Sequence, residues 1–322
     1  MSRIILDSEA KTDDDIGKIP DMRTVEERLE SGFILLDKAA GPSSHQVASW
    51  ARNMFGLERL GHGGTLDPFA TGVLPLMAGK SMKLTKKILT HDKTYICVFR
   101  FASEPDSKML KQVMSNMTGR VFNVPPEISA VKIQVRSRRI FKFEKLDFKN
   151  NQMVARVECE AGTYIRTMAR DMGLLLNMKV ELKELRREAS GIFTLDDCVT
   201  LQQLADAYWL WKELSQPEAL LRIIHPIEKL LLDYPSVTVK DSAAAALSHG
   251  APLLRPGIVS IDPAIDDGRD IVVNTMKGET VGIVNMLVTS DSVKDMESGE
   301  IARPSMVLLD QDLYPRRWKK SE

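Results

Sequence analysis

The 322 residues are 43% hydrophobic and 27% charged, which is typical of a globular protein that buries a sizeable core without disulfides or metals. The 44 basic and 44 acidic residues cancel, so net charge alone argues against a nucleic-acid partner. No run approaches the ~18 apolar residues of a transmembrane helix. Residues 1–15 also lack the apolar segment of a signal peptide, so a cytoplasmic protein without membrane contact is expected.

Residues 1–25 are acidic and without periodicity, and we expect them to form an irregular N-terminal extension. A short apolar strand is predicted at 32–38. A helix is then predicted over 43–56, because apolar residues recur at helical spacing. Ser43 or Ser44 can cap its beginning, and Gly56 can end it. The residues expected on its buried face are Val47, Trp50, Ala51, Met54 and Phe55.

The middle of the chain mixes strands with helices. Alternating apolar residues predict strands over 95–101 and 153–160. Directly after the second strand, Thr163 is expected to cap a helix. Its predicted core-facing residues are Ile165, Met168, Ala169, Met172 and Leu176. Because strands and helices do not alternate regularly, the pattern favours an α+β fold with a mixed, mainly antiparallel sheet over a doubly wound one.

The pattern changes near Asp233. Short strand-like runs then lie between Gly, Pro and Asp turns, at 237–239, 258–261, 271–274, 280–285 and 306–309. This spacing is typical of a small β-barrel or sandwich. We therefore expect three parts: the extension at 1–25, a main domain at 26–232 and a small β domain at 233–316.

The charges are segregated along the chain although they cancel overall. The segment 80–100 has six basic residues against one acidic, and the segment 132–149 has seven against two. The C-terminal tail is also basic. Such segregation can produce a basic face for RNA on a neutral protein, although each run alone is equally consistent with an ordinary solvated surface.

Several chemistries have no signature in this sequence. The three cysteines form no CxxC pair, and the five histidines show no metal-ligand spacing, so neither a disulfide framework nor a zinc site is expected. The P-loop, the dinucleotide fingerprint, the serine-hydrolase elbow and the HExxH motif are also missing. We therefore expect no cofactor and no metal.

One loop is unusual in its composition. The segment 61–74 contains four glycines, which permit positive φ angles and close approach of a ligand to the backbone. Asp67 lies in it, and the following Pro68 biases Asp67 toward an extended conformation. An isolated Asp-Pro pair is usually a structural turn. The complete string is much more specific than the pair.

The string GHGGTLDPFATGVLP resembles the active-site motif of the TruB/dyskerin family of pseudouridine synthases. Further blocks similar to that family follow in its order, namely LDKAAGPSSHQV, DKTY, VPPEISAVK, EAGTYIRTMARDMG and ELRREASGIF. The resemblance spans about residues 24–232. The segment that begins VTVKDSAAAALSHG is similar to a PUA domain, a small RNA-binding β-barrel. The resemblance implies a synthase catalytic domain followed by a PUA-like domain.

The family has a bacterial branch that acts alone on the tRNA T-loop, and an archaeal and eukaryotic branch that works inside H/ACA ribonucleoproteins. WLWKELSQPEALLRIIHPIEKLL, the VKDSAAAALSHGA block and the N-terminal extension resemble the second branch. That resemblance implies an rRNA or tRNA substrate, an H/ACA guide RNA and small accessory proteins as partners.

The resemblance also implies roles for single residues. Asp67 is expected to be the nucleophile, ionised although buried, with Arg166 as the charge partner that keeps it so. Tyr95 is expected to stack on a flipped base, and Tyr164 to lie near its C5 atom. His62 is expected to enter the RNA stack, and Leu185 to form an apolar wall of the pocket. Lys38 is expected to support the loop. Lys132, Arg136 and Arg138 are expected to bind RNA phosphates.

Three alternative functions are considered for this sequence. A stand-alone tRNA synthase would use the same chemistry without a guide. A non-catalytic RNA-binding scaffold is a different class, and the intact set of Asp67, Tyr95, Tyr164 and Arg166 argues against it. A glycosidase would need a second acid in the family blocks, and none occurs there.

Overall fold

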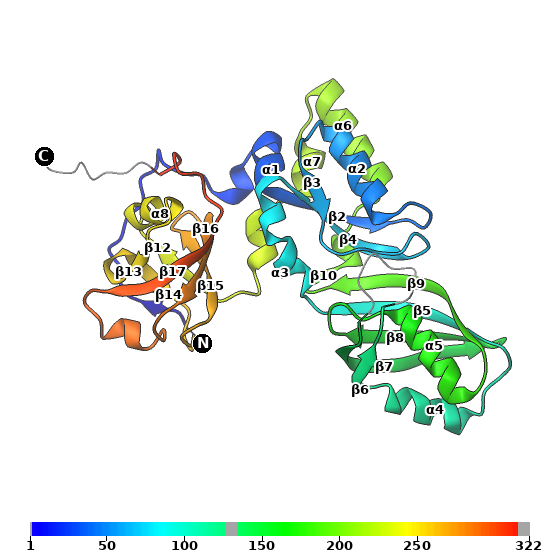
Figure 1. Ribbon diagram of the computed structural model, residues 1–322. Helices are drawn as coiled ribbons and strands as arrows, with labels where there is room; N and C mark the ends of the chain where they lie inside the picture. The colour runs from blue at the N-terminus through cyan, green and yellow to red at the C-terminus, as the bar shows by residue number, and fades with distance from the viewer. Residues whose placement is uncertain (1, 126–133, 315–322) are drawn as a thin grey trace, which may run out of the picture. The chain divides into compact units, whose positions relative to one another are not determined.

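The computed structural model describes residues 2–125 and 134–314, and it divides into two compact units (Figure 1). One comprises Phe33–Ile223, and the other joins Met1–Gly32 to Ile224–Glu322. Lys132, most of the VPPEISAVK block and the basic tail lie outside the described residues. Within the described ranges, no helix is both long and apolar enough to cross a membrane. The domain boundaries near 26 and 233 stay predictions.

A mixed sheet forms the centre of the unit 33–223. Its strands follow the order β2-β4-β9-β5-β8-β7-β6, with β3 paired to β4 and β10 paired to β9. Only the β4–β9 pair is parallel among these, so the expected mixed, mainly antiparallel sheet is confirmed. The strands are β2 (Gly32–Lys38), β3 (Leu60–His62), β4 (Thr71–Ala78), β5 (Lys93–Phe101), β6 (Gly119–Asn123), β7 (Arg136–Lys149), β8 (Gln152–Cys159), β9 (Val180–Ser190) and β10 (Phe193–Thr194).

Helices connect and cover these strands. They are α2 (Ser44–Phe55), α3 (Thr85–Leu89), α4 (Ser107–Asn116), α5 (Ile165–Leu176), α6 (Leu201–Leu214) and α7 (Glu218–Ile223), with short 3₁₀ turns at Gly79–Leu84 and Leu195–Asp197. Helix α5 packs against β9, and α4 packs against α5 and β7 (Figure 1). Residues that alternate along β5 and β8 are buried as predicted, from Tyr95 to Phe101 and from Met153 to Cys159.

The helix predicted over 43–56 is confirmed with one correction. Ser43 forms a capping box with Gln46, and Gly56 ends the helix at φ 63° in the left-handed region. Trp50, however, is 47% exposed, so the prediction that it faces the core is wrong. The stripe of buried residues on this helix is narrower than the stripe of apolar residues in its sequence, and Ser44 is one of the buried residues.

Two local predictions near the site differ from the structure. Thr163 does not cap α5: Tyr164 is the N-cap residue, and the Thr163 hydroxyl donates instead to the carbonyl of Glu160 at 2.6 Å. The glycine-rich segment is also shorter as a loop than its composition suggests, because β4 begins at Thr71. Val73 and Leu74 are fully buried there, and this burial favours a strand.

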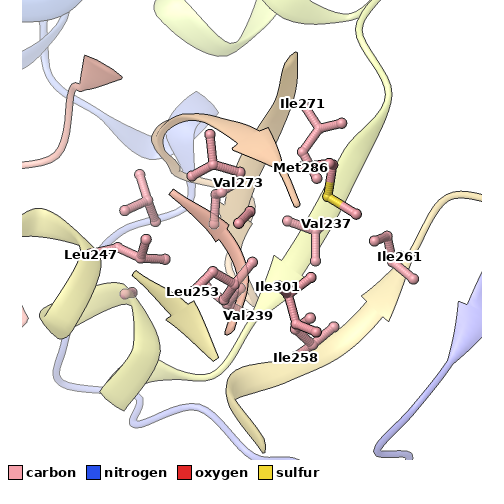
Figure 2. Close-up of a cluster of buried hydrophobic side chains, with 14 of the residues drawn as sticks. Val237, Val239, Leu247, Leu253, Ile258, Ile261, Ile271, Val273, Met286 and Ile301 are labelled. Atoms are coloured by element: carbon pink, nitrogen blue, oxygen red, sulfur yellow. The ribbon is translucent and has the colours of Figure 1, made fainter. Parts of the chain in front are cut away.

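The other unit contains a seven-stranded sheet in the order β1-β14-β12-β15-β16-β17-β13. Its strands are β1 (Ile4–Ile5), β12 (Ser236–Val239), β13 (Leu253–Leu254), β14 (Ile258–Ile261), β15 (Asp270–Thr275), β16 (Thr280–Met286) and β17 (Glu300–Val307), and it also holds α1 (Val25–Ser31), β11 (Ile224–Pro226), a 3₁₀ turn (Ile227–Leu231) and α8 (Asp241–Ser248). Figure 2 shows Val237, Ile258 and Ile271 among the side chains that converge in its core. The last strand begins six residues before the predicted 306–309, because Glu300–Ala302 pair with β13 and β16.

The N-terminal extension is part of this second unit. Strand β1 pairs with β14, at Ile4 with Ile261 and at Ile5 with Ser260. Arg3 extends the contact, because its guanidinium lies 2.8 Å from a carboxylate oxygen of Asp262 and also donates to the hydroxyl of Ser236. The sequence left open whether residues 1–25 pack on the C-terminal domain, and these contacts answer that they do.

Candidate active site

Asp67 lies in the turn between β3 and β4. The carbonyl of Asp67 accepts from the amide of Ala70 at 3.0 Å, which closes the turn around Pro68. The side chain of Asp67 is 29% exposed. The expectation that this carboxylate is buried is therefore wrong: a ligand can reach it from solvent. An exposed edge of this kind is what a nucleophile needs.

Two residues from other elements hold the backbone on either side of Asp67. Lys38, at the end of β2, is only 1% exposed. Its Nζ donates to the carbonyls of Pro68 at 3.1 Å and Ala70 at 2.8 Å. Ser44, at the beginning of α2, accepts from the amide of Leu66 at 2.8 Å and donates to its carbonyl at 3.1 Å. Lys38 thus contacts the loop on one side and Ser44 on the other, and the role of Lys38 in substrate or RNA binding stays a prediction.

Arg166 supplies the positive charge next to Asp67. It is the second residue of α5, and its Nη2 donates to Oδ1 of Asp67 at 2.9 Å. The two residues lie 99 positions apart in the sequence, so the fold alone brings them together. The two groups form an ion pair, and the contact holds the Asp67 side chain in a fixed orientation.

Tyr95 and Leu185 lie on adjacent strands. Tyr95 pairs with Arg187 across β5 and β9, and Leu185 pairs with Cys97 two residues further along. Both side chains are 8% exposed. Burial raises the pKa of the Tyr95 phenol to about 12, so it is a neutral hydroxyl at any physiological pH. Tyr95 and Leu185 therefore offer an apolar wall with one hydroxyl.

Arg187 is a residue that sequence reasoning missed. Its side chain is 1% exposed, and it donates to the carbonyls of Val73 at 2.7 Å and Gly64 at 3.1 Å. It is also the residue opposite Tyr95 in the pairing of β5 with β9. Arg187 thus connects the glycine-rich loop to the tyrosine of β5. The signal was present in the sequence, since strand alternation places Arg187 on the same face as Leu185.

His62 ends β3, five residues before Asp67 in the sequence. Its ring packs edge-on against His45, with ring centroids 4.6 Å apart. Burial, and then the nearby His45 and Arg187, lower the pKa of His62 to about 4, so the ring is neutral at pH 7. A neutral ring is suited to stacking rather than to phosphate binding.

The remaining predicted residues lie on β7 and near the beginning of α5. Arg136 and Arg138 belong to β7, and the guanidinium of Arg138 lies beside the turn at Gly162 that leads to Tyr164. Tyr164 precedes Arg166 by two residues, at the N-cap of α5. Arg138 therefore contacts the region of the site, whereas no hydrogen bond or ion pair joins Arg136 to it among residues 2–125 and 134–314.

The described residues contain no group of three His, Cys, Asp or Glu side chains that could hold a metal ion. The described residues bring together a solvent-accessible carboxylate paired with an arginine and a loop held by residues from three elements. Beside them lies an apolar surface that carries one uncharged phenol. Such a set can form and break a covalent bond to carbon at a carboxylate oxygen.

Comparisons with known proteins agree over the whole chain. Family models match at residues 1–48 (DKCLD domain), 52–109 (TruB family pseudouridylate synthase, N-terminal domain), 166–232 (tRNA pseudouridylate synthase B C-terminal domain) and 235–308 (PUA domain). A probable tRNA pseudouridine synthase B of Pyrobaculum arsenaticum is 40% identical over 99% of this chain and 96% of its own length.

Two solved structures are similar throughout. A structure of an H/ACA ribonucleoprotein bound to a substrate RNA containing 2′-deoxyuridine has a chain that matches with a TM-score of 0.90 and 34% identity, over 99% of this chain and 98% of that one. A chain of a Cbf5-Nop10-Gar1 complex matches with a TM-score of 0.88 and 36% identity, over 98% and 96%.

Proposed function

Because this chain belongs to the TruB family of pseudouridine synthases, we propose that it isomerises specific uridines in rRNA or tRNA as the catalytic subunit of an H/ACA ribonucleoprotein. Its partners would be a guide RNA and small accessory proteins like those in the similar complexes. The observation that carries the guided role is the match over almost the full length, including the extension and the C-terminal PUA domain.

In the proposed reaction Asp67 is the nucleophile. The bond between N1 of the base and C1′ of the ribose breaks, and a new bond forms between C5 and C1′. The proton leaves C5, and N1 gains a proton. The Asp67 carboxylate attacks either C1′ or the base ring, and both routes require it to be ionised. The ion pair with Arg166 at 2.9 Å would hold the carboxylate in place for either route.

The target uridine must leave its stack to reach Asp67. We propose that Tyr95 stacks on the flipped base, that Leu185 forms the adjacent wall, and that Tyr164 lies near C5. His62 would fill the space in the RNA left by the base. Aromatic stacking contributes ~1–3 kcal/mol per base and does not depend on base identity. Guide pairing would therefore supply the sequence selectivity.

RNA placement is assigned to the basic strand and to the C-terminal domain. Arg136 and Arg138 on β7 would contact phosphates, as would Lys132, which lies outside the described residues. The proposed catalytic domain covers residues 26–232 and the PUA domain residues 233–316. Double-stranded RNA is recognised mainly by shape, so this domain would hold the guide rather than select the target.

The direct test is Asp67→Asn, which keeps the size of the side chain and removes its charge. In the reconstituted complex, with substrate RNA tritiated at C5 of uridine, tritium release should be lost while RNA affinity changes by less than about threefold. Asp196→Asn, at an exposed aspartate away from the site, is the matched control and should behave as the unmodified protein. Pseudouridine formation by Asp67→Asn would contradict the nucleophile assignment.

A stand-alone tRNA enzyme is the second candidate, because similar proteins carry the name tRNA pseudouridine synthase B. The two candidates differ in their need for the guide. The protein alone on unmodified tRNA is compared with the complete complex on a guided substrate. Full activity at the T-loop uridine, with no gain from guide RNA and accessory proteins, would exclude the guided role.

A further inference from the structure

Helix α5 begins without a side-chain cap, as α3 and α8 also do, whereas three other helices have a capping box. In α1, α2 and α6 a Thr or Ser at the N-cap forms a capping box: its hydroxyl accepts from the backbone three residues later, and the Glu or Gln there accepts from the backbone N–H of the cap residue. Helix α5 has Tyr164 at the N-cap, with no side-chain cap hydrogen bond. A phenol cannot reach back to the first turn. A functional side chain therefore occupies a position that the helix would otherwise use for its own stability.

For the backbone N–H of the cap residue, the acceptor that the Glu or Gln supplies in those helices comes here from strand β6. Asn123, the last residue of β6, accepts from the backbone N–H of Tyr164 through Oδ1 at 2.8 Å. Its Nδ2 donates to the carbonyl of the same Tyr164 at 3.2 Å. The side chain is buried, at 2% exposure, and an amide is the group that can satisfy a peptide donor and acceptor together. One further bond joins the same elements, from the Thr167 hydroxyl to the carbonyl of Val124 at 2.6 Å.

We propose that Asn123 is a positioning residue for the synthase reaction, acting through the backbone of Tyr164. Its two hydrogen bonds fix the residue from which α5 starts, and Arg166 projects toward Asp67 from the same turn. A shift of this turn displaces the phenol of Tyr164 and the guanidinium of Arg166 together. The inference rests on the proposed roles of Tyr164 and Arg166.

The expected size of the effect follows from geometry. Misplacement of a reacting or orienting group by ~1 Å can cost about 100-fold in rate. Asn123→Ala should therefore lower the single-turnover rate of pseudouridine formation by about 10- to 100-fold. RNA affinity should change by less than about threefold, because the side chain is buried and does not face solvent. Asn116→Ala, at an exposed asparagine of α4 in the same unit, is the matched control and should leave the rate unchanged.

A double-substitution cycle distinguishes positioning from a general structural role. If Asn123 acts through this turn, Asn123→Ala should slow the reaction strongly in the wild-type background and by a clearly smaller factor beside Tyr164→Phe, because the part carried by the Tyr164 hydroxyl is then already lost while the part carried by Arg166 remains. The assay is tritium release from C5 in the reconstituted complex. Equal losses in both backgrounds, or a loss of RNA binding as large as the loss of rate, would overturn the proposal.

A second variant keeps the test decisive if Asn123→Ala does not fold. Asn123→Asp keeps the size and the acceptor for the Tyr164 N–H, and it removes the donor to the Tyr164 carbonyl. The same cycle is then measured with it, and the same two outcomes apply. The wild-type complex is the reference for the function itself. If it releases no tritium from guided RNA or from tRNA, the proposed function fails. A change confined to the Asn123 variants concerns this inference alone.

Discussion

Lys38 offers a test of how the catalytic loop is held. Its ammonium is buried and donates to three carbonyls, those of Ala39 at 2.9 Å, Pro68 at 3.1 Å and Ala70 at 2.8 Å. Asp67 is next to the second of these residues. Lys38→Met keeps an unbranched apolar stem of similar length up to Cε, and it removes the ammonium with all three of its hydrogen bonds.

The loss of stability in Lys38→Met depends on which of the three carbonyls is left without any hydrogen-bond donor. Ala70 is fully buried, whereas Ala39 and Pro68 are exposed, so water can replace the ammonium only at the latter two. A buried carbonyl without a partner costs ~1–3 kcal/mol. Burial lowers the pKa of Lys38, and removal of this desolvated charge offsets part of the loss. We therefore expect the free energy of unfolding to fall by about 1–3 kcal/mol.

The catalytic effect should exceed the effect on stability. Release of the turn at Pro68 displaces the Asp67 carboxylate, and the single-turnover rate should fall by about 100-fold under conditions where the protein is still folded. Urea denaturation measures the stability, and tritium release from C5 measures the rate. Lys108→Met, at an exposed lysine of α4, is the control. If Lys38→Met has the stability and rate of this control, the argument that Lys38 holds the loop is refuted.

Three further predictions concern separate contacts. Arg166→Lys keeps the charge but changes its geometry beside Asp67, and should lower the single-turnover rate by about 10- to 100-fold with RNA affinity unchanged; a wild-type rate would contradict the role of the guanidinium. His62 binds a proton at pH 6.5 when unfolded but only near pH 4 when folded, so the unfolding free energy should fall as pH drops through that window. This part of the pH dependence should be missing in His62→Phe, which urea denaturation at several pH values can check. Arg3→Ala should destabilise the C-terminal unit by about 1–2 kcal/mol, seen by calorimetry as a lower transition temperature; an unchanged transition would show that the extension adds no stability.

Much of the fold could be predicted because the spacing of apolar residues along a segment reflects which side of that helix or strand is buried. The alternation from Tyr95 to Phe101 and the capping signals at Ser43 and Gly56 depend on neighbouring residues alone, and each is confirmed. The family motif led to Asp67 as the candidate nucleophile, because the specificity of the motif is contained in one continuous string, and that role stays a prediction. Sequence reasoning failed at Trp50, which is exposed although its spacing is that of the apolar face, and at Thr163, whose hydroxyl donates to the nearby carbonyl of Glu160 instead of capping α5.

The sequence by itself determined the class of fold, the family and the candidate residues. Only the tertiary structure decided how those residues are held. Arg166 meets Asp67 across 99 positions, Arg187 joins Gly64 to Tyr95, and Asn123 fixes Tyr164 from a different strand. The physical reason is that a buried polar side chain acquires its partners from the fold. The identity of those partners is not contained in the spacing of residues along the chain.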